Sequence, residues 1–81
     1  MQKLIFRTYD TKAKVYSPLL FSVTKGAMLR QFQDIANDRQ HPVGQHPEDY
    51  VLFLVGEDDE RSGETIIYGE DKKESLGRAR S

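Results

Sequence analysis

The sequence lacks cysteine and tryptophan, and only three of its 81 residues are proline. The absence of cysteine excludes disulfides and thiolate metal sites, and it fits a reducing compartment. No apolar run approaches the roughly 20 residues that a membrane-spanning helix needs, and no signal peptide precedes the strand-like segment that follows Lys3. We therefore expect a small intracellular protein of one domain, away from membranes. Its stability must come from its core, and from a second copy of the chain if it dimerises.

Charge is unevenly distributed along the chain. Residues 1–45 contain seven Lys or Arg and three acidic residues. Residues 46–81 contain five Lys or Arg and ten acidic residues. A basic half and an acidic half can steer a polyanion to one side of a protein. The alternative is that the two halves of the sequence do not separate in space.

The longest apolar run, Tyr50–Val55, predicts a strand with two hydrophobic faces at the centre of the structure. Before it, residues 4–9 and 15–21 read as an antiparallel hairpin whose second strand lies at an edge or is irregular at Pro18. Thr24 is a predicted N-cap for an amphipathic helix over residues 25–37. After a long loop and the central strand, an acidic turn precedes a fourth strand at residues 65–68.

The predicted fold class is α+β, a small antiparallel sheet in ββαββ order with one helix packed across a face. Residues 1–68 form this domain. Residues 69–81 are charged, with Leu76 as their only large apolar residue, and we expect them to be a flexible tail. The aromatic residues are too numerous for one helix to cover, so the other face is predicted to line a ligand surface or a homodimer interface.

Catalysis has little support in the sequence. No nucleophile–base pattern or phosphate-binding glycine motif is present, and we expect a protein that is not an enzyme and needs no cofactor. His41 and His46, with Glu48 and Asp49, could suggest a metal site, but their spacing within a loop does not define ligand geometry. We interpret the histidine–proline–acid segment as a turn that leads into the central strand, and predict no metal.

The first hairpin interleaves basic and aromatic residues. Single-stranded nucleic acid is held by cations along its phosphates and by rings that stack on its bases. Arg7 and Tyr9 share a face of the first strand because side chains alternate along a strand. The alternative is that the tyrosines belong to a core or an interface and the lysines are solvated. The candidate nucleic-acid-binding residues are Lys3, Arg7, Tyr9, Lys12, Lys14 and Tyr16.

Several short segments in order, Tyr9–Ala13, Thr24–Ala27, Ala36–Asp38 and above all His46–Asp59, resemble the small non-structural protein of gokushovirus-type microviruses. These are bacteriophages with circular single-stranded DNA genomes. The resemblance implies a non-enzymatic DNA-binding protein in the cytoplasm of the infected bacterial host, which acts in viral DNA replication or in its switch to packaging. The alternative is a small dimeric adaptor that binds the phage replication-initiation protein or a host replication factor without contacting DNA.

Overall fold

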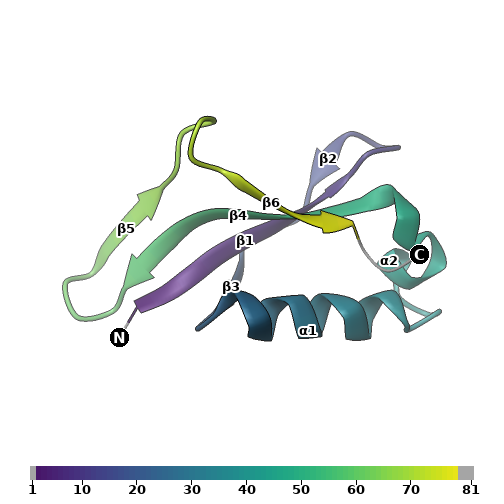
Figure 1. The fold of residues 1–81 in the computed structure, drawn as a ribbon, viewed down its shortest axis with the longest axis horizontal. Coiled ribbons are helices and arrows are strands. Elements are labelled where there is room, and N and C mark those ends of the chain that lie inside the picture. Colours follow the sequence, from purple (N-terminus) through teal and green to yellow (C-terminus); the bar gives the residue numbers. More distant parts are fainter. Residues whose placement is uncertain (1, 79–81) are drawn as a thin grey trace.

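The computed structural model describes residues 2–78 and forms an antiparallel sheet with one long helix along one face (Figure 1). No helix in this described part of the chain is long and apolar enough to cross a membrane. The elements follow one another as β1 (Gln2–Asp10), β2 (Val15–Tyr16), β3 (Leu20–Ser22), α1 (Lys25–Ala36), α2 (Pro42–Gln45), the 3₁₀ turn η1 (Pro47–Asp49), β4 (Tyr50–Asp59), β5 (Glu64–Ile67) and β6 (Glu74–Arg78).

Strands β1 and β4 form the centre of the sheet and pair with each other along almost their whole lengths. The outer edge of β1 pairs with β2 at one end and with β3 at the other. The outer edge of β4 is shared in the same way by β6 and β5. The predicted α+β class and the central position of the Tyr50–Val55 strand are therefore confirmed.

Proline explains why the predicted second strand is two strands. Pro18 has no amide hydrogen to donate to a ladder, so pairing with β1 stops after Tyr16 and resumes at Leu20. The chain between them is fixed by Ser17, whose N–H donates to the Thr8 carbonyl (2.8 Å) and whose Oγ accepts from the Thr8 N–H (2.9 Å). The sequence prediction of an irregular edge at Pro18 is confirmed.

Helix α1 covers one face of the sheet. The Thr24 hydroxyl accepts from the Ala27 N–H at 3.0 Å, as predicted for an N-cap. The apolar stripe of the helix packs on β1 and β4, because alternate residues of each strand point to the helix side. This buried core contains Phe6, Met28, Phe32, Ala36, Val43, Leu52 and Leu54.

The C-terminal segment corrects one expectation. Residues 69–81 were predicted to be a flexible tail, but Glu74–Arg78 forms strand β6 on the edge of β4, and Leu76 packs against the core. Lys25 of α1 also pairs with Glu74 at 2.9 Å. The prediction failed because the free edge of β4 supplies the backbone partners, which local composition does not reveal. Residues 79–81 lie outside the described part.

Candidate nucleic-acid interface

The sheet has a second face, turned away from α1, that no helix within residues 2–78 covers (Figure 1). Phe6 and Leu54 point to the helix, so the alternation of side chains places Arg7, Tyr9 and Phe53 on the opposite side. Arg7 lies opposite Phe53 in the register, and Tyr9 lies opposite Tyr16 of β2. We call this surface the open face; it carries Ile5, Arg7, Tyr9, Tyr16, Phe21, Phe53, Val55 and Ile67.

Three rings form a row on the open face. The ring centroids of Tyr9 and Tyr16 lie 4.6 Å apart at 45°, and those of Tyr16 and Phe53 lie 6.3 Å apart at 60°. These distances are typical of interacting aromatic pairs. Tyr16 remains 50% exposed within this row, so an incoming planar group can reach its ring.

Arg7 lies beside this row and is held in place by the chain around Pro18. Its Nη1 donates to the Ser17 carbonyl at 2.6 Å. Arg7, Tyr16, Val55, Ile67 and Lys73 line a hollow of about 290 Å³ on the open face. The site therefore combines a fixed guanidinium with apolar and aromatic walls.

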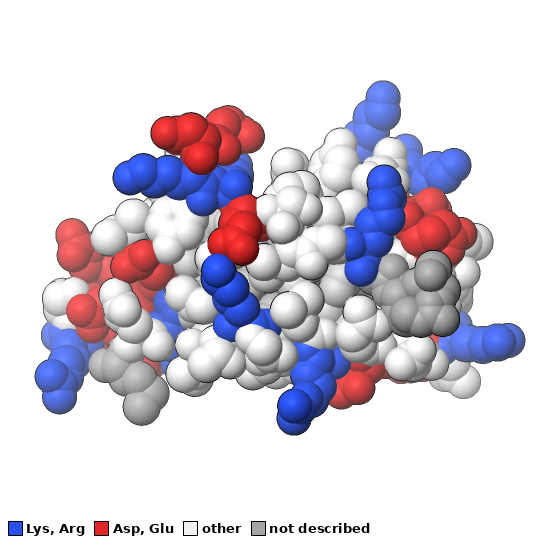
Figure 2. Space-filling view, in the orientation of Figure 1, with Lys and Arg blue, Asp and Glu red and all other residues white. Residues whose placement is uncertain are grey.

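Lys12 and Lys14 are exposed in the β1–β2 hairpin, at the end of the open face next to Tyr9. The turn is fixed by Asp10, whose Oδ1 accepts from the N–H groups of Lys12 (2.9 Å) and Ala13 (3.0 Å). Lys14 has a φ of 61°, in the left-handed region. Basic side chains extend from this end of the molecule in Figure 2.

Lys3 lies apart from the other predicted site residues. It is opposite Asp58 in the β1–β4 register, at the far end of β1 from Tyr9, and its Nζ is 3.4 Å from a carboxylate oxygen of Glu60. The structure therefore brings Arg7, Tyr9 and Tyr16 together, places Lys12 and Lys14 in the adjoining hairpin, and leaves Lys3 among acidic residues.

Two residues of the open face were missed by sequence reasoning. Phe53 was counted among the aromatic residues that one helix cannot cover but was not named as a site residue, although its alternation with Leu52 and Leu54 could have placed it beside Arg7 and Tyr9. Lys73 was assigned to the tail. It reaches the hollow because the β5–β6 loop rises on the side of the sheet opposite α1 (Figure 1), and no local pattern signals that position.

The sequence pattern of the Phage ORF5 protein family matches residues 3–81. The chain belongs to the Phage ORF5 protein family. The predicted bacteriophage origin is thus confirmed. No curated protein and no solved structure matches this ORF5-family sequence.

The opposite end of the ORF5-family protein is acidic. Glu57, Asp58, Asp59 and Glu60 lie at the β4–β5 hairpin, and acidic side chains gather there in Figure 2. The Tyr68 hydroxyl donates to the Glu57 carboxylate at 2.6 Å, and this bond, with partial burial, raises the pKa of Tyr68. The hairpin end carries Lys12 and Lys14 but also the carboxylates of Asp10, Glu48 and Asp49, which lie around Lys12, so charges of both signs are present there.

A second polar cluster lies where η1 meets the β1–β2 hairpin. Ligand atoms of His46, Glu48 and Asp49 lie within 4.8 Å of one another. His41 does not join them, because its Nδ1 accepts from the Val43 N–H at 3.1 Å and caps α2. Partial burial, followed by the nearby Asp10 carboxylate, raises the pKa of Tyr50. The ligand atoms of His46, Glu48 and Asp49 lie closer together than the sequence suggested. That this cluster binds no metal stays a prediction.

Proposed function

We propose that this protein binds single-stranded DNA without sequence preference, through its open face. It acts in the cytoplasm of an infected bacterium, during synthesis of a phage genome or its switch to packaging, and it catalyses no reaction. Membership of a phage family supports this setting. The resemblance to the non-structural protein of gokushovirus-type microviruses supports a single-stranded genome as the partner.

One observation carries the proposal: the row formed by Tyr9, Tyr16 and Phe53 on a helix-free sheet face, with Arg7 beside it. Base stacking on such rings tolerates any sequence, because every base has a π-face. Arg7 is suited to phosphate because its planar guanidinium presents several donors, and only one of its nitrogens is engaged by Ser17. Lys12 and Lys14 extend the positive charge along the hairpin.

The test is fluorescence anisotropy of a labelled 20-nucleotide oligo(dT) against salt concentration. Each phosphate contact contributes about 0.7 to the slope of log affinity against log salt for a single strand. Lys12→Ala/Lys14→Ala should therefore weaken binding and reduce the slope by about 1.4 if each lysine contacts one phosphate. Because the sequence has no tryptophan, tyrosine emission can be read directly, and stacking should quench it.

The matched control is Arg30→Ala/Arg39→Ala, which removes the same charge from exposed positions on and just after α1. If both double variants weaken binding equally, the positive charge acts without a defined site. If micromolar wild-type protein does not bind the oligonucleotide at low salt, the DNA proposal is wrong.

The second candidate is a dimeric adaptor that binds the phage replication-initiation protein or a host replication factor without DNA. Large apolar side chains are exposed on both sides of the sheet, among them Leu19, Phe21, Val23, Ile66 and Ile67. Exposed apolar surface of this kind favours protein contacts. Sedimentation separates the candidates: the adaptor requires a mass of twice 9.3 kDa and no anisotropy change with oligo(dT).

A further inference from the structure

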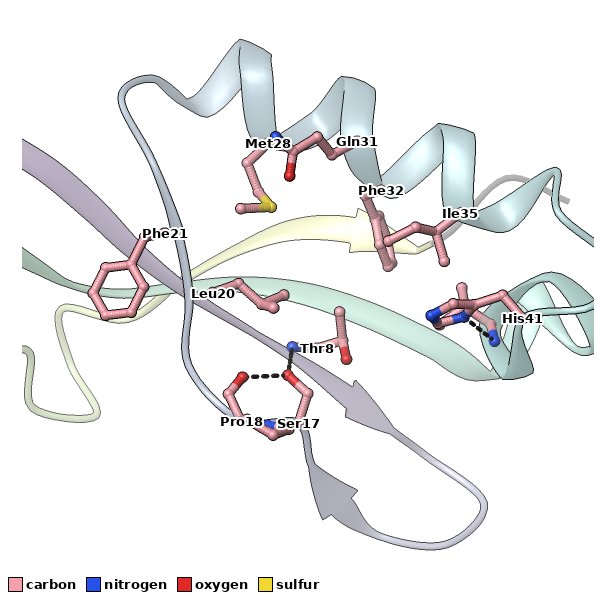
Figure 3. Close-up of a pocket in the computed structure, with 11 residues that line it drawn as sticks. Thr8, Ser17, Pro18, Leu20, Phe21, Met28, Gln31, Phe32, Ile35 and His41 are labelled. Carbon is pink, nitrogen blue, oxygen red and sulfur yellow. Dashed lines mark hydrogen bonds between the residues drawn. The ribbon is translucent and has the colours of Figure 1, made fainter.

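A cavity of about 350 Å³ lies between helix α1 and the segment that connects β2 to β3 (Figure 3). It exists because pairing with β1 is interrupted around Pro18, so the chain leaves the sheet edge opposite the helix. Met28 and Phe32 of α1 form one wall, and Leu20 and Thr8 face them from the strands. The cavity is separate from the row of Tyr9, Tyr16 and Phe53, although Phe21 at the edge of the open face also lines it, and it does not depend on DNA binding.

The chemistry of the walls determines what can enter. No Asp, Glu, Lys or Arg is among the described residues that line the cavity. A charged ligand would lose its hydration there without gaining a counter-charge, which is costly. Phosphates, carboxylates and metal ions are thus disfavoured, and the walls of Met28, Phe32 and Leu20 favour an apolar molecule. A cavity of about 150 Å³ holds one benzene ring, so this volume suits a molecule of about two rings.

His41 gives the cavity a directional polar group. Its Nδ1 accepts from the Val43 N–H at 3.1 Å, so the neutral imidazole carries its proton on Nε2. In Figure 3 the other ring nitrogen, Nε2, points into the cavity. His41 therefore presents an N–H donor to an otherwise mainly apolar space. Few well-placed polar groups in an apolar pocket are the usual features of a small-molecule site.

We propose that this cavity binds a small uncharged ligand of about two rings that presents a hydrogen-bond acceptor to His41 Nε2. Apolar contact with Met28, Phe32 and Leu20 provides most of the affinity. The hydrogen bond fixes the orientation of the ligand and discriminates between molecules of the same shape.

The experiment is a ¹H–¹⁵N NMR titration of the full chain with three probes of one shape. 2-Acetylnaphthalene is neutral and has a carbonyl acceptor, 2-ethylnaphthalene lacks the acceptor, and 2-naphthoate is charged. Saturable shifts at the amides of Thr8, Met28 and Val43 are expected with the acetyl probe. The ethyl probe should bind about 5-fold more weakly, the ratio expected for one hydrogen bond of about 1 kcal/mol. The naphthoate should not saturate.

Two variants test the assignment. His41→Asn keeps a side-chain oxygen for the Val43 N–H but removes the Nε2 donor, so the preference for the acetyl probe should disappear while binding persists. Ile35→Trp places a larger side chain at the cavity wall and should abolish binding with an unchanged melting temperature. If Ile35→Trp does not fold, His41→Asn still decides. Equal affinity for the charged probe, shifts confined to Tyr9 and Tyr16, or an acetyl preference that survives His41→Asn would overturn the proposal.

Discussion

The two faces of the sheet are built from the same strands but have different surroundings. On the covered face, Phe6, Leu52 and Leu54 are buried under α1. On the open face, Ile5 and Val55 are as buried as these, yet neither helix of the described chain lies over them. They are surrounded by a rim of exposed rings and aliphatic side chains, which includes Tyr16, Phe21 and Ile67.

This difference indicates why an 81-residue chain retains apolar residues on both faces. A small domain needs few aromatic rings outside its core for stability, and the core under α1 already contains Phe6 and Phe32. The rings that remain exposed are therefore available to a partner. The covered face should control the free energy of unfolding, whereas the open face should control binding.

The largest expected effect is on the free energy of unfolding and comes from a substitution on the covered face. Phe32→Ala removes a ring that is 2% exposed and should lower the free energy of unfolding by about 3–5 kcal/mol. Phe53→Ala deletes the same atoms from the half-buried open face and should cost less than half as much. Urea unfolding followed by circular dichroism measures both. Equal losses would show that the two faces are energetically alike.

A second test concerns how tightly the covered side is packed. A Cβ added at Gly44 of α2 would clash with the backbone carbonyl of Asp38, whereas one at Gly26 of α1 would meet nothing within 4 Å. Gly44→Ala should therefore destabilise the protein by about 1–3 kcal/mol. Gly26→Ala should stabilise it by about 0.5–1 kcal/mol, because alanine loses less backbone freedom in a helix. A neutral Gly44→Ala would mean that α2 moves freely against α1.

The third prediction concerns DNA affinity and the ring of Tyr16 on the open face. Tyr16→Ala should lower affinity for oligo(dT) by about 1–3 kcal/mol, the range for one stacked ring. Tyr16→Phe keeps the ring and should retain most of the affinity. Arg7→Ala is a less informative variant, because Arg7 also bonds the Ser17 carbonyl and its loss would disturb the β2–β3 connection. If Tyr16→Ala leaves the affinity for oligo(dT) unchanged but alters sedimentation, the open face serves self-association rather than DNA binding.

Most of the fold could be predicted because its signals are local. Six consecutive apolar residues indicated the centre of the sheet, Thr24 indicated the helix start, and Pro18 indicated the broken edge. Strand β6 could not be predicted, because its pairing partner is the distant edge of β4 and its own sequence has one large apolar residue.

The site was predicted in part for a similar reason. The alternation of side chains along β1 correctly placed Arg7 and Tyr9 on one face. The register between strands decides which side chains of neighbouring strands lie beside Arg7 and Tyr9. This register depends on the whole sheet. In the observed register, Phe53 lies opposite Arg7, and Lys3 lies at the acidic end of the sheet beside Glu60. Neither pairing is visible in the hairpin sequence.

The smallest expected effect concerns Asp10, which shapes the turn of the β1–β2 hairpin. Hydrogen bonds from backbone N–H groups, the Ala13 N–H first, hold the pKa of Asp10 below its ordinary value of 3.8. The folded state therefore binds this proton less readily than the unfolded state. The stabilisation is complete above pH 3.8 and is lost as the pH falls through the lower pKa of the folded state.

Asp10→Asn keeps an oxygen for the Lys12 and Ala13 N–H groups but cannot titrate. We expect wild type to be the more stable protein at pH 6, with the difference shrinking toward pH 3, where other carboxylates titrate equally in both proteins. Parallel urea titrations across this range measure it. A difference that stays constant down to pH 3 would mean that Asp10 acts through shape alone, and that the charge on the hairpin does not help to hold Lys12 and Lys14 beside the open face.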